Sequence, residues 1–226
     1  MPAPFPSPVV RSDASLDIDG VAVDLAVRVL VAGVVPEPRF GREAEVAATA
    51  RSLADAGADL VDVSLAPRLV GPAVRAVPVP VVVRAESVDA AAAAARAGAA
   101  LILVPVALLR DVAAGISPSA PSPPAGVRVP ALAALVDDPS GIADARAVAD
   151  QLGVPLGLDS ARWSGAEAIA READAVADGC RILRTADVRR SRRIAEVMTA
   201  ILAARRDPAT TPAPTPSPHV DDEGLR

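Results

Sequence analysis

Apolar positions along the chain follow one repeated pattern from residue 27 onward. An alanine-rich amphipathic segment ends at a glycine, and a β-branched apolar run begins two or three residues later. Glycine at such a junction takes the left-handed conformation that ends a helix, and the loop to the next strand is then short. The chain is therefore predicted to alternate helices and strands. The glycines at these junctions are Gly57, Gly98, Gly153 and Gly179.

Seven apolar runs are predicted to be strands. They are near-continuous stretches of Val, Ile, Leu and Ala, which is typical of parallel strands buried on both faces. Alternating α and β elements of this kind predict an α/β fold, a TIM-type (β/α) barrel reduced to seven clear strands where a full barrel has eight. The predicted strands cover residues 28–35, 59–65, 79–84, 100–105, 130–136, 154–158 and 180–184.

The eighth strand has no obvious place. The interval 106–129 holds a short helix and then a loop, Ser117-Pro-Ser-Ala-Pro-Ser-Pro-Pro124. Either a strand lies near residues 126–129, or the barrel has only seven. An open doubly wound sheet is the alternative fold. Against it, the first strand leads into Pro-Glu-Pro-Arg-Phe at 36–40, without the glycine-rich turn of dinucleotide-binding folds.

The two ends of the chain differ from its middle. Residues 1–14 and 207–226 are rich in proline and are predicted to be disordered, leaving one globular domain over residues 15–206. That domain begins with alternating apolar and polar residues around Asp19-Gly20, which predicts a β-hairpin.

Three serines are placed to cap helices. Ser87 and Ser140 each precede an amphipathic segment, and Ser164 with Glu167 forms a capping-box pattern. The last helix carries an apolar stripe at helical spacing, which is predicted to pack on the sheet. The stripe consists of Ile194, Val197, Met198, Ile201 and Leu202.

Composition excludes several kinds of chemistry. The chain contains no Lys, Asn or Tyr, and its only histidine, His219, lies in the proline-rich C-terminal segment. Lysine Schiff bases, Ser-His-Asp hydrolysis and histidine proton transfer are therefore excluded within this chain. Cys180 is the only cysteine, so no intrachain disulfide or thiolate cluster can form, which fits a reducing compartment. No metal site is expected from these residues.

Charge and hydropathy also limit the kinds of partner that the chain is expected to bind. The net charge is -5 and aromatic residues make up 1% of the chain, so neither a basic field nor stacking platforms are present for nucleic acid. No apolar run approaches the roughly 20 residues of a membrane span, and the N-terminus lacks a signal-peptide pattern. We therefore expect a cytoplasmic protein that binds neither membrane nor nucleic acid.

Four segments resemble the motifs of one enzyme family in order and spacing. They read Val-Ala-Gly-Val-Val-Pro-Glu-Pro at 31–38, Ala-Gly-Ala-Asp-Leu-Val-Asp-Val at 56–63, Val-Pro-Leu-Gly-Leu-Asp-Ser-Ala-Arg-Trp-Ser-Gly at 154–165 and Arg-Thr-Ala-Asp-Val at 184–188. With the leading hairpin, they resemble the dihydropteroate synthase family, the pterin-binding barrels of folate synthesis. The resemblance covers residues 16–205 and implies transfer of a dihydropterin from its diphosphate to p-aminobenzoate.

The departures from the family fall on its working residues. The resemblance implies a pterin held by carboxylates and amides deep in the barrel, and a diphosphate met at the mouth by arginine and usually Mg²⁺. Arg84 stands where the family has a pterin-facing aspartate, which reverses the charge. Mg²⁺ is accordingly expected only if synthase activity is retained. Other family positions have lost their polar side chains: Gly33, Val35, Leu103, Val104 and Ala186.

Some family positions keep a charged residue. Asp138 matches the carboxylate that pairs with the aminopyrimidine edge, and Arg184 matches the mouth arginine, whose planar fork suits phosphate. Asp62 either belongs to this site or orients a loop. The substrate-binding candidates are Asp62, Arg84, Asp138, Arg162, Arg184 and Asp187.

Arginines crowd the first turn of the last helix. The helix dipole disfavours each cation there by roughly 0.3–1 kcal/mol. Arg189 and Arg190 are therefore anion-binding candidates, with a solvated charge run offset by Asp187 and Glu196 as the alternative. Trp163, the only tryptophan, either stacks on a heterocycle or packs over the rim.

Three functional hypotheses follow. In the first, a catalytically degraded dihydropteroate synthase-like barrel binds a phosphorylated ligand or a protein partner at its mouth, the partner being a homologous subunit or a second copy. In the second, an active synthase has rebuilt its pocket around Arg84, Asp138, Arg162 and Arg184. In the third, a barrel enzyme acts on another phosphorylated small molecule, with Asp138 or Asp159 as its base.

Overall fold

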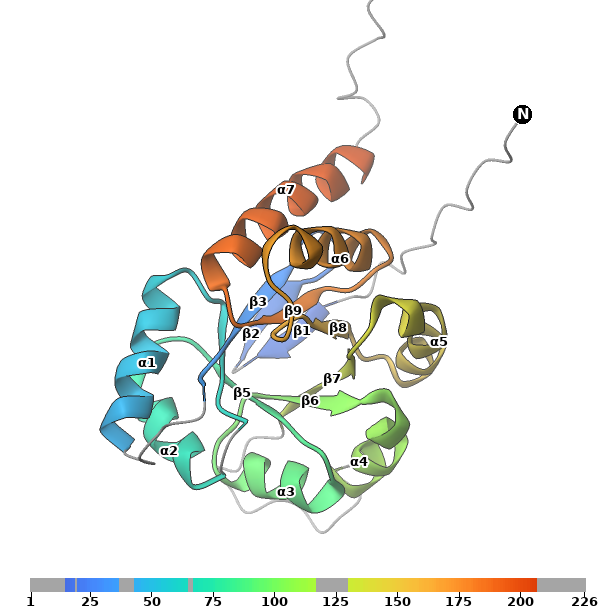
Figure 1. Ribbon diagram of the computed structural model, residues 1–226. Coiled ribbons are helices and arrows are strands. Elements are labelled where there is room, and N and C mark those ends of the chain that lie inside the picture. The colour runs from blue at the N-terminus through green and yellow to red at the C-terminus, as the bar shows by residue number, and fades with distance from the viewer. Residues whose placement is uncertain (1–14, 19, 37–42, 65–66, 117–129, 207–226) are drawn as a thin grey trace, which may run out of the picture.

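A closed parallel barrel forms the centre of the molecule (Figure 1). A computed structural model describes residues 15–18, 20–36, 43–64, 67–116 and 130–206, and among these seven strands follow one another round the barrel in chain order. The last strand pairs with the first, which confirms the predicted seven-stranded TIM-type barrel and shows the open-sheet alternative to be wrong. The strands are β3 (Leu30–Val34), β4 (Leu60–Asp62), β5 (Val81–Arg84), β6 (Leu101–Pro105), β7 (Ala131–Val136), β8 (Leu156–Asp159) and β9 (Ile182–Thr185).

Helices surround the barrel and alternate with its strands (Figure 1). The four junction glycines adopt the predicted positive φ, between 66° and 104°. No helix in the described part of the chain is long and apolar enough to cross a membrane. Residues 126–129, where an eighth strand was a prediction, lie outside the described residues. The helices are α1 (Glu43–Asp55), α2 (Pro67–Ala76), α3 (Val88–Arg96), α4 (Leu109–Ile116), α5 (Ile142–Leu152), α6 (Gly165–Ala177) and α7 (Val188–Arg206), with 3-10 turns η1 (Val106–Leu108) and η2 (Pro139–Gly141).

The strands bury both faces in two separate apolar layers. Leu101 and Leu103 of β6 point into the barrel, whereas Ile102 and Val104 between them belong to the outer layer under the helices. Alternate residues of a strand point to opposite faces, so each strand supplies both layers. Because the interior is filled by such apolar side chains, the barrel is a packed core and not a pore.

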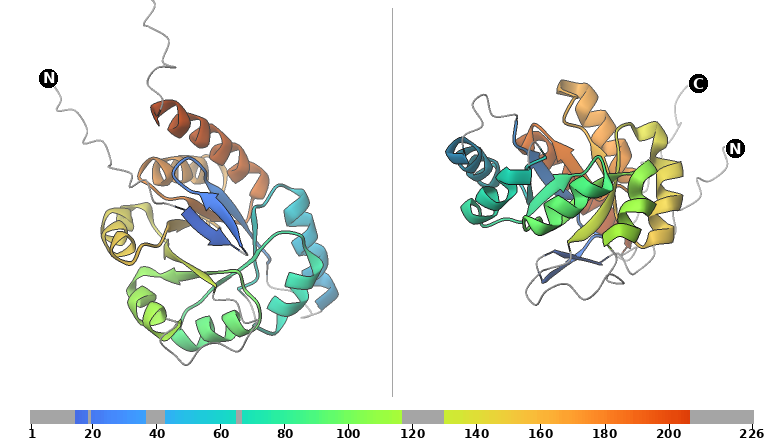
Figure 2. Two further views of the ribbon diagram at one scale, coloured as in Figure 1. Left: turned by 180° about the vertical axis from the view of Figure 1, so that it is seen from behind. Right: turned by 90° about the horizontal axis from the view of Figure 1, so that it is seen from below.

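The N-terminal hairpin covers the end of the barrel where the strands begin. Its strands β1 (Ser15–Ile18) and β2 (Val21–Asp24) pair antiparallel, as predicted, and Figure 2 shows them lying across that end. Leu16 and Ile18 are buried in the same cluster as Leu30 and Leu60 at the starts of β3 and β4. The hairpin does not cover the opposite end, where the strands finish.

Two of the three predicted cap serines stand at the N-cap position of a helix, and one of them makes the side-chain hydrogen bond. Ser87 accepts a hydrogen bond from the amide of Ala90 at 3.1 Å, as predicted for the start of α3. The prediction for Ser140 is wrong, because Asp138 caps η2 ahead of it. Ser164 does occupy the N-cap position of α6, but its side chain makes no capping hydrogen bond, and Glu167 pairs with Arg171 at 3.0 Å.

The apolar stripe of α7 is only partly buried. Ile194 is buried and Met198 and Leu202 pack against the core. Val197 is 59% exposed and Ile201 is 39% exposed, so the prediction that the whole stripe packs on the sheet is wrong. Helix α7 projects past the barrel (Figure 1), and its outward side has no strand beneath it.

Cys180 is buried between α6 and β9 and should be unreactive in the folded protein. Burial raises the pKa of its thiol to about 12, and the thiolate is the form that reacts. We expect a maleimide to leave native protein unmodified at pH 8 and to add one label per chain in denaturant, as measured by intact mass. Rapid labelling of native protein would show that this part of the core opens readily.

Candidate functional site at the barrel mouth

A ring of charged residues follows directly from the alternation of the strands. Leu60, Val82, Leu135 and Ile182 face the barrel interior as part of its apolar cluster. The residue two positions further along faces the same way. On these strands and on β8 it is charged, so five inward-facing charged side chains collect where the strands end. They are Asp62, Arg84, Asp137, Asp159 and Arg184.

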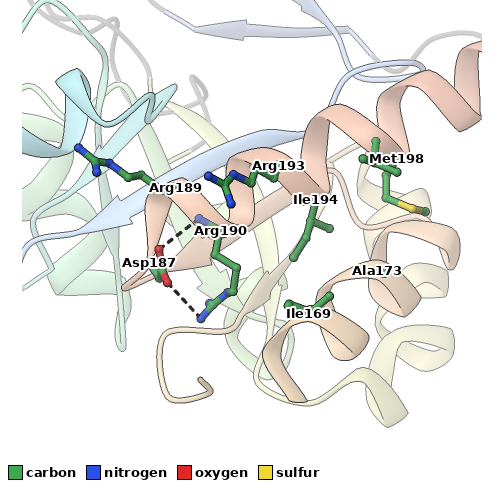
Figure 3. Close-up of a pocket in the computed structure, with 9 residues that line it drawn as sticks. Ile169, Ala173, Asp187, Arg189, Arg190, Arg193, Ile194 and Met198 are labelled. Atoms are coloured by element: carbon green, nitrogen blue, oxygen red, sulfur yellow. Dashed lines mark hydrogen bonds and ion pairs between the residues drawn. The ribbon is translucent and has the colours of Figure 1, made fainter. Parts of the chain in front are cut away.

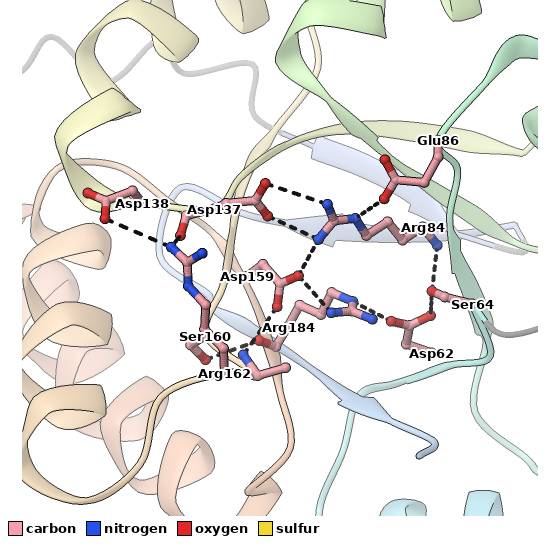
Figure 4. Close-up of polar contacts among 11 residues, drawn as sticks. Asp62, Ser64, Arg84, Glu86, Asp137, Asp138, Asp159, Ser160, Arg162 and Arg184 are labelled. Carbon is pink, nitrogen blue, oxygen red and sulfur yellow. Dashed lines mark hydrogen bonds and ion pairs between the residues drawn. The ribbon is translucent and has the colours of Figure 1, made fainter. Parts of the chain in front are cut away.

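These side chains bond to one another across the mouth (Figure 4). Arg184 Nε donates to Asp62 Oδ2 at 2.5 Å and its Nη1 donates to Asp159 Oδ2 at 2.7 Å. Arg84 Nη1 donates to the same Asp159 oxygen at 2.5 Å and to Asp137 Oδ1 at 3.0 Å. Two guanidinium groups and three carboxylates therefore form one continuous network.

Further contacts hold the two ends of the network. Asp62 also accepts a hydrogen bond from the hydroxyl of Ser64, whose oxygen accepts one from the Arg84 amide at 2.9 Å. Arg84 Nε donates to Glu86 Oε1 at 2.6 Å. The guanidinium nitrogens of Arg84 are thus all hydrogen-bonded to protein carboxylates. The side chain reaches across the mouth from β5 to the ends of β7 and β8.

Burial and charge act on these groups in opposite directions. Burial lowers the pKa of Arg184, but Asp62 and Asp159 outweigh that effect and the net pKa is raised. Burial raises the pKa of the wholly enclosed Asp62 carboxyl, while Arg184 and Ser64 oppose the rise. The arginines therefore remain cations that are matched by protein carboxylates.

The described residues at the mouth include more carboxylates than arginines. The arginines are Arg84, Arg162 and Arg184, whereas the carboxylates are Asp62, Glu86, Asp137, Asp138 and Asp159 (Figure 4). These eight side chains sum to a formal charge of -2, a figure that does not include Arg171, which pairs with Asp138 at 3.3 Å.

Comparison with solved structures identifies the architecture. The chain matches a Yersinia pestis dihydropteroate synthase in complex with a sulfonamide drug at a TM-score of 0.58, with 17% identity over 85% of this chain and 98% of that one. It matches the Xanthomonas albilineans dihydropteroate synthase in complex with 7,8-dihydropteroate at 0.59, with 20% identity over 84% and 99%. The fold is that of the dihydropteroate synthases.

A third synthase of this fold, from Vibrio fischeri ES114, matches at a TM-score of 0.60, with 15% identity over 84% of this chain and 98% of that one. No protein-family model matches the chain, and no curated protein matches its sequence significantly. The resemblance to the dihydropteroate synthases found in the sequence is thus confirmed at the level of fold. What this barrel does depends on the chemistry of its own residues.

Three substrate-binding candidates lie together in the dihydropteroate synthase-like barrel. Asp62, Arg84 and Arg184 all belong to the mouth network. Asp62 does more than orient a loop, because its buried carboxylate is the main partner of Arg184. Arg184 holds the predicted mouth position, although two carboxylates already engage its fork.

Asp138 and Arg162 lie beside this network and are not part of its interior. Asp138 follows the inward-facing Asp137, so it points away from the barrel axis and accepts a hydrogen bond from the Ser140 amide at 2.9 Å. The pKa of Asp138 is lowered by the hydrogen bonds from Ser140 and by Arg171. Arg162 donates to the backbone oxygen of Asp137 and lies 3.9 Å from the Asp138 carboxylate.

Asp187 and Arg190 lie on the outer side of β9. Asp187 caps α7 by accepting from the Arg190 amide at 3.1 Å. Arg190 Nη2 donates to Glu172 Oε1 at 3.1 Å and to Thr185 Oγ1 at 3.2 Å. The guanidinium of Arg190, an anion-binding candidate, is thus paired with protein groups outside the barrel, whereas Arg184 of β9 faces the barrel interior.

Sequence reasoning missed a second polar cluster outside the barrel. Glu172 of α6 is fully buried, and its Oε1 accepts hydrogen bonds from the hydroxyls of Ser160 at 2.6 Å and Ser191 at 2.8 Å. A buried carboxylate inside an Ala-rich amphipathic helix has no signal in a hydropathy pattern. This cluster ties α6 and α7 to the ends of β8 and β9.

Trp163 packs at the rim, as one of its two predicted roles requires. It is half-buried against the outer apolar layer. The guanidinium carbons of Arg162 and Arg171 lie 4.9 and 4.6 Å from its ring centroid, so cation–π contacts occupy the ring. A heterocycle would have to displace these arginines.

The described mouth residues do not fit the Mg²⁺ that a synthase of this fold implies. The described residues contain no group of three potential ligands arranged around a common point. The carboxylate oxygens of Asp62 and Asp159 that face the interior instead accept from guanidinium groups. Two pockets stand out in the described part of the chain, and neither lies among the mouth residues.

Proposed function

We propose that this chain is a dihydropteroate synthase-like barrel without synthase activity that acts by binding a protein partner. The observation that supports it most strongly is Arg84, which spans the mouth and bonds to Asp137, Asp159 and Glu86. In this fold an active synthase must admit a pterin diphosphate through the same opening.

Electrostatics argue against a diphosphate at this mouth. Transfer from a diphosphate requires cations that stabilise the leaving charge as it develops. Arg84 and Arg184 are matched by carboxylates, so a bound diphosphate would have to compete with Asp62 and Asp159 for them. A phosphorylated ligand at the mouth is therefore the weaker alternative.

The barrel interior argues against a pterin. A pterin ring has a polar edge that needs buried hydrogen-bonding partners, since an unsatisfied buried polar group costs about 1–3 kcal/mol. The layer below the mouth contains Leu103, Leu135 and Ala133, all buried and apolar. Such a layer supplies shape and stability to the barrel but no partners for a heterocycle.

Binding of a protein partner is compatible with the intact barrel and the exposed polar groups at its rim. The barrel, its hairpin cover and its packed core are intact, while the polar groups that reach solvent lie at the rim: Asp137, Asp138, Glu86 and Arg162 are each at least half exposed. A homologous catalytic subunit is the first partner to test, with a second copy of this chain as the other. The unpaired Cys180 supports a cytoplasmic location for such an assembly.

The first experiment measures product formation. Purified chain would be mixed with dihydropterin diphosphate, p-aminobenzoate and Mg²⁺, and 7,8-dihydropteroate quantified by chromatography against an active synthase. We expect no product above that of the Arg184→Ala variant, because that variant removes the one mouth cation retained from the family. Product formed by the wild-type chain and lost in Arg184→Ala would establish an active enzyme instead.

Binding is tested separately from catalysis. Titration calorimetry with 7,8-dihydropteroate, the compound bound in the Xanthomonas albilineans structure, should show no heat of binding. Adding the chain to a homologous synthase should change the elution volume of that enzyme in size-exclusion chromatography. If neither the synthase nor a second copy associates, the partner-binding proposal fails even when the product assay is negative.

A further inference from the structure

A groove runs between α6 and α7 on the outside of the barrel (Figure 3). Its volume is about 510 Å³. Ile169 of α6 and Ile194, Val197 and Met198 of α7 form its apolar walls, and arginines of α7 lie along one side. The groove therefore combines apolar walls with positively charged side chains.

The groove offers surfaces that the described fold leaves without partners. Ile169 is 47% exposed and Val197 is 59% exposed. Arg189 and Arg193 are exposed and make no ion pair with any described residue, in contrast to Arg190, which is bound to Glu172. The carboxylate of Asp187 at one end of the groove is directed to Arg190, at 3.7 Å. Two cations near the start of α7 therefore have no counter-charge among the described residues.

The chemistry of a matching occupant is an extended segment with both acidic and apolar residues. A segment with this chemistry occurs in residues 219–226, which read His-Val-Asp-Asp-Glu-Gly-Leu-Arg. Asp221, Asp222 and Glu223 supply three negative charges next to the apolar Val220 and Leu225. We propose that residues 220–225 dock in the α6–α7 groove of their own chain.

Chain length permits this return. From Arg206 at the end of α7 back to Arg189 is about 26 Å along the helix, at about 1.5 Å per residue. The 13 residues 207–219 are rich in proline and reach about 40 Å when extended, at about 3.1 Å per residue. The acidic segment can therefore turn back over the full length of the groove.

Tethering makes a weak contact sufficient. Because the segment belongs to the same chain, docking is an intramolecular event, and even a low intrinsic affinity can populate the docked state. Contacts between Arg189 or Arg193 and the acidic residues would be exposed and screened by salt. The docked segment would cover the exposed side chains of Val197 and Ile169.

The test uses the full chain with one added spin label. Because Cys180 is buried, the variant Gly224→Cys can be labelled with a nitroxide at that position alone. Methyl NMR spectra would then follow Ile169 and Ile194 in the groove, with Ile102 and Ile142 elsewhere in the barrel as internal references. At low salt we expect the groove methyl signals to lose most of their intensity and the reference signals to keep theirs.

Charge variants separate specific docking from chance proximity. Arg189→Glu with Arg193→Glu should restore the groove signals, and so should Asp221→Lys with Asp222→Lys; combining both sets should weaken the signals again. Arg205→Glu on the same helix is the matched control and should change nothing. Unaltered groove signals in the labelled wild-type background would overturn the proposal.

Mixing distinguishes the docked segment's own chain from a second copy. Labelled chains without isotope would be mixed with unlabelled, isotope-enriched chains. Full signals in this mixture support docking within one chain. Loss of groove signal in the mixture that grows with concentration would instead place a neighbouring copy's segment in the groove and refute the intramolecular contact. Neither result depends on whether the barrel has synthase activity.

Discussion

Replacement of Arg184 by methionine is expected to lower the free energy of unfolding by about 3–5 kcal/mol, because it leaves the fully buried Asp62 without its guanidinium partner. Methionine fills similar volume, so the loss reports on charge more than on packing. Asp159 loses one bond in this variant but keeps Arg84 at 2.5 Å. The cost therefore concentrates on Asp62, whose remaining polar side-chain partner is Ser64.

Urea denaturation followed by circular dichroism measures this loss. Arg193→Met is the matched control, because Arg193 is exposed and unpaired among the described residues, and its effect should stay within about 0.5 kcal/mol. Adding Asp62→Asn to Arg184→Met should recover part of the lost stability, since the uncompensated charge is then gone. A loss below about 1 kcal/mol for Arg184→Met would mean that water or the loops outside the described residues stabilise Asp62.

The periodicity of the strands identifies which charged residues face the barrel mouth, but motif matching did not choose all of them as site residues. The barrel, the hairpin and the junction glycines were predicted because each depends on local periodicity and backbone conformation. The same two-residue period, counted from Leu135 and Gly157, points to Asp137 and Asp159 as inward-facing. Motif matching instead selected Asp138, whose side chain caps η2.

Pairing between distant residues could not be predicted from the sequence. Whether Arg184 is open to a ligand or closed by Asp62 depends on contacts between strands separated by more than a hundred residues. Likewise, Arg190 resembled a free cation because its partner Glu172 lies on another helix. The partner of a long charged side chain depends on the folded structure. Counting charges along the sequence therefore gives the net charge but does not show which arginines are free to bind a ligand.

Restoration of a single family residue should fail to reopen a pocket. Leu103, which stands where the resemblance to the dihydropteroate synthases implies an asparagine, is fully buried in the barrel interior beside Ala133 and one strand from Arg84. Leu103→Asn should lower the free energy of unfolding by about 3–5 kcal/mol, because it removes apolar volume and buries an amide without partners. Thermal and urea unfolding measure the change directly.

Leu103→Met is the control that separates polarity from shape. It conserves volume and should cost less than about 1.5 kcal/mol. An asparagine variant as stable as the methionine variant would show that the interior beneath Arg84 has both space and hydrogen-bonding partners. In that event a polar pocket persists below the mouth network, and pterin binding would have to be measured again in the asparagine variant. The expected instability instead means that the apolar interior beneath Arg84 offers neither space nor hydrogen-bonding partners to a polar side chain.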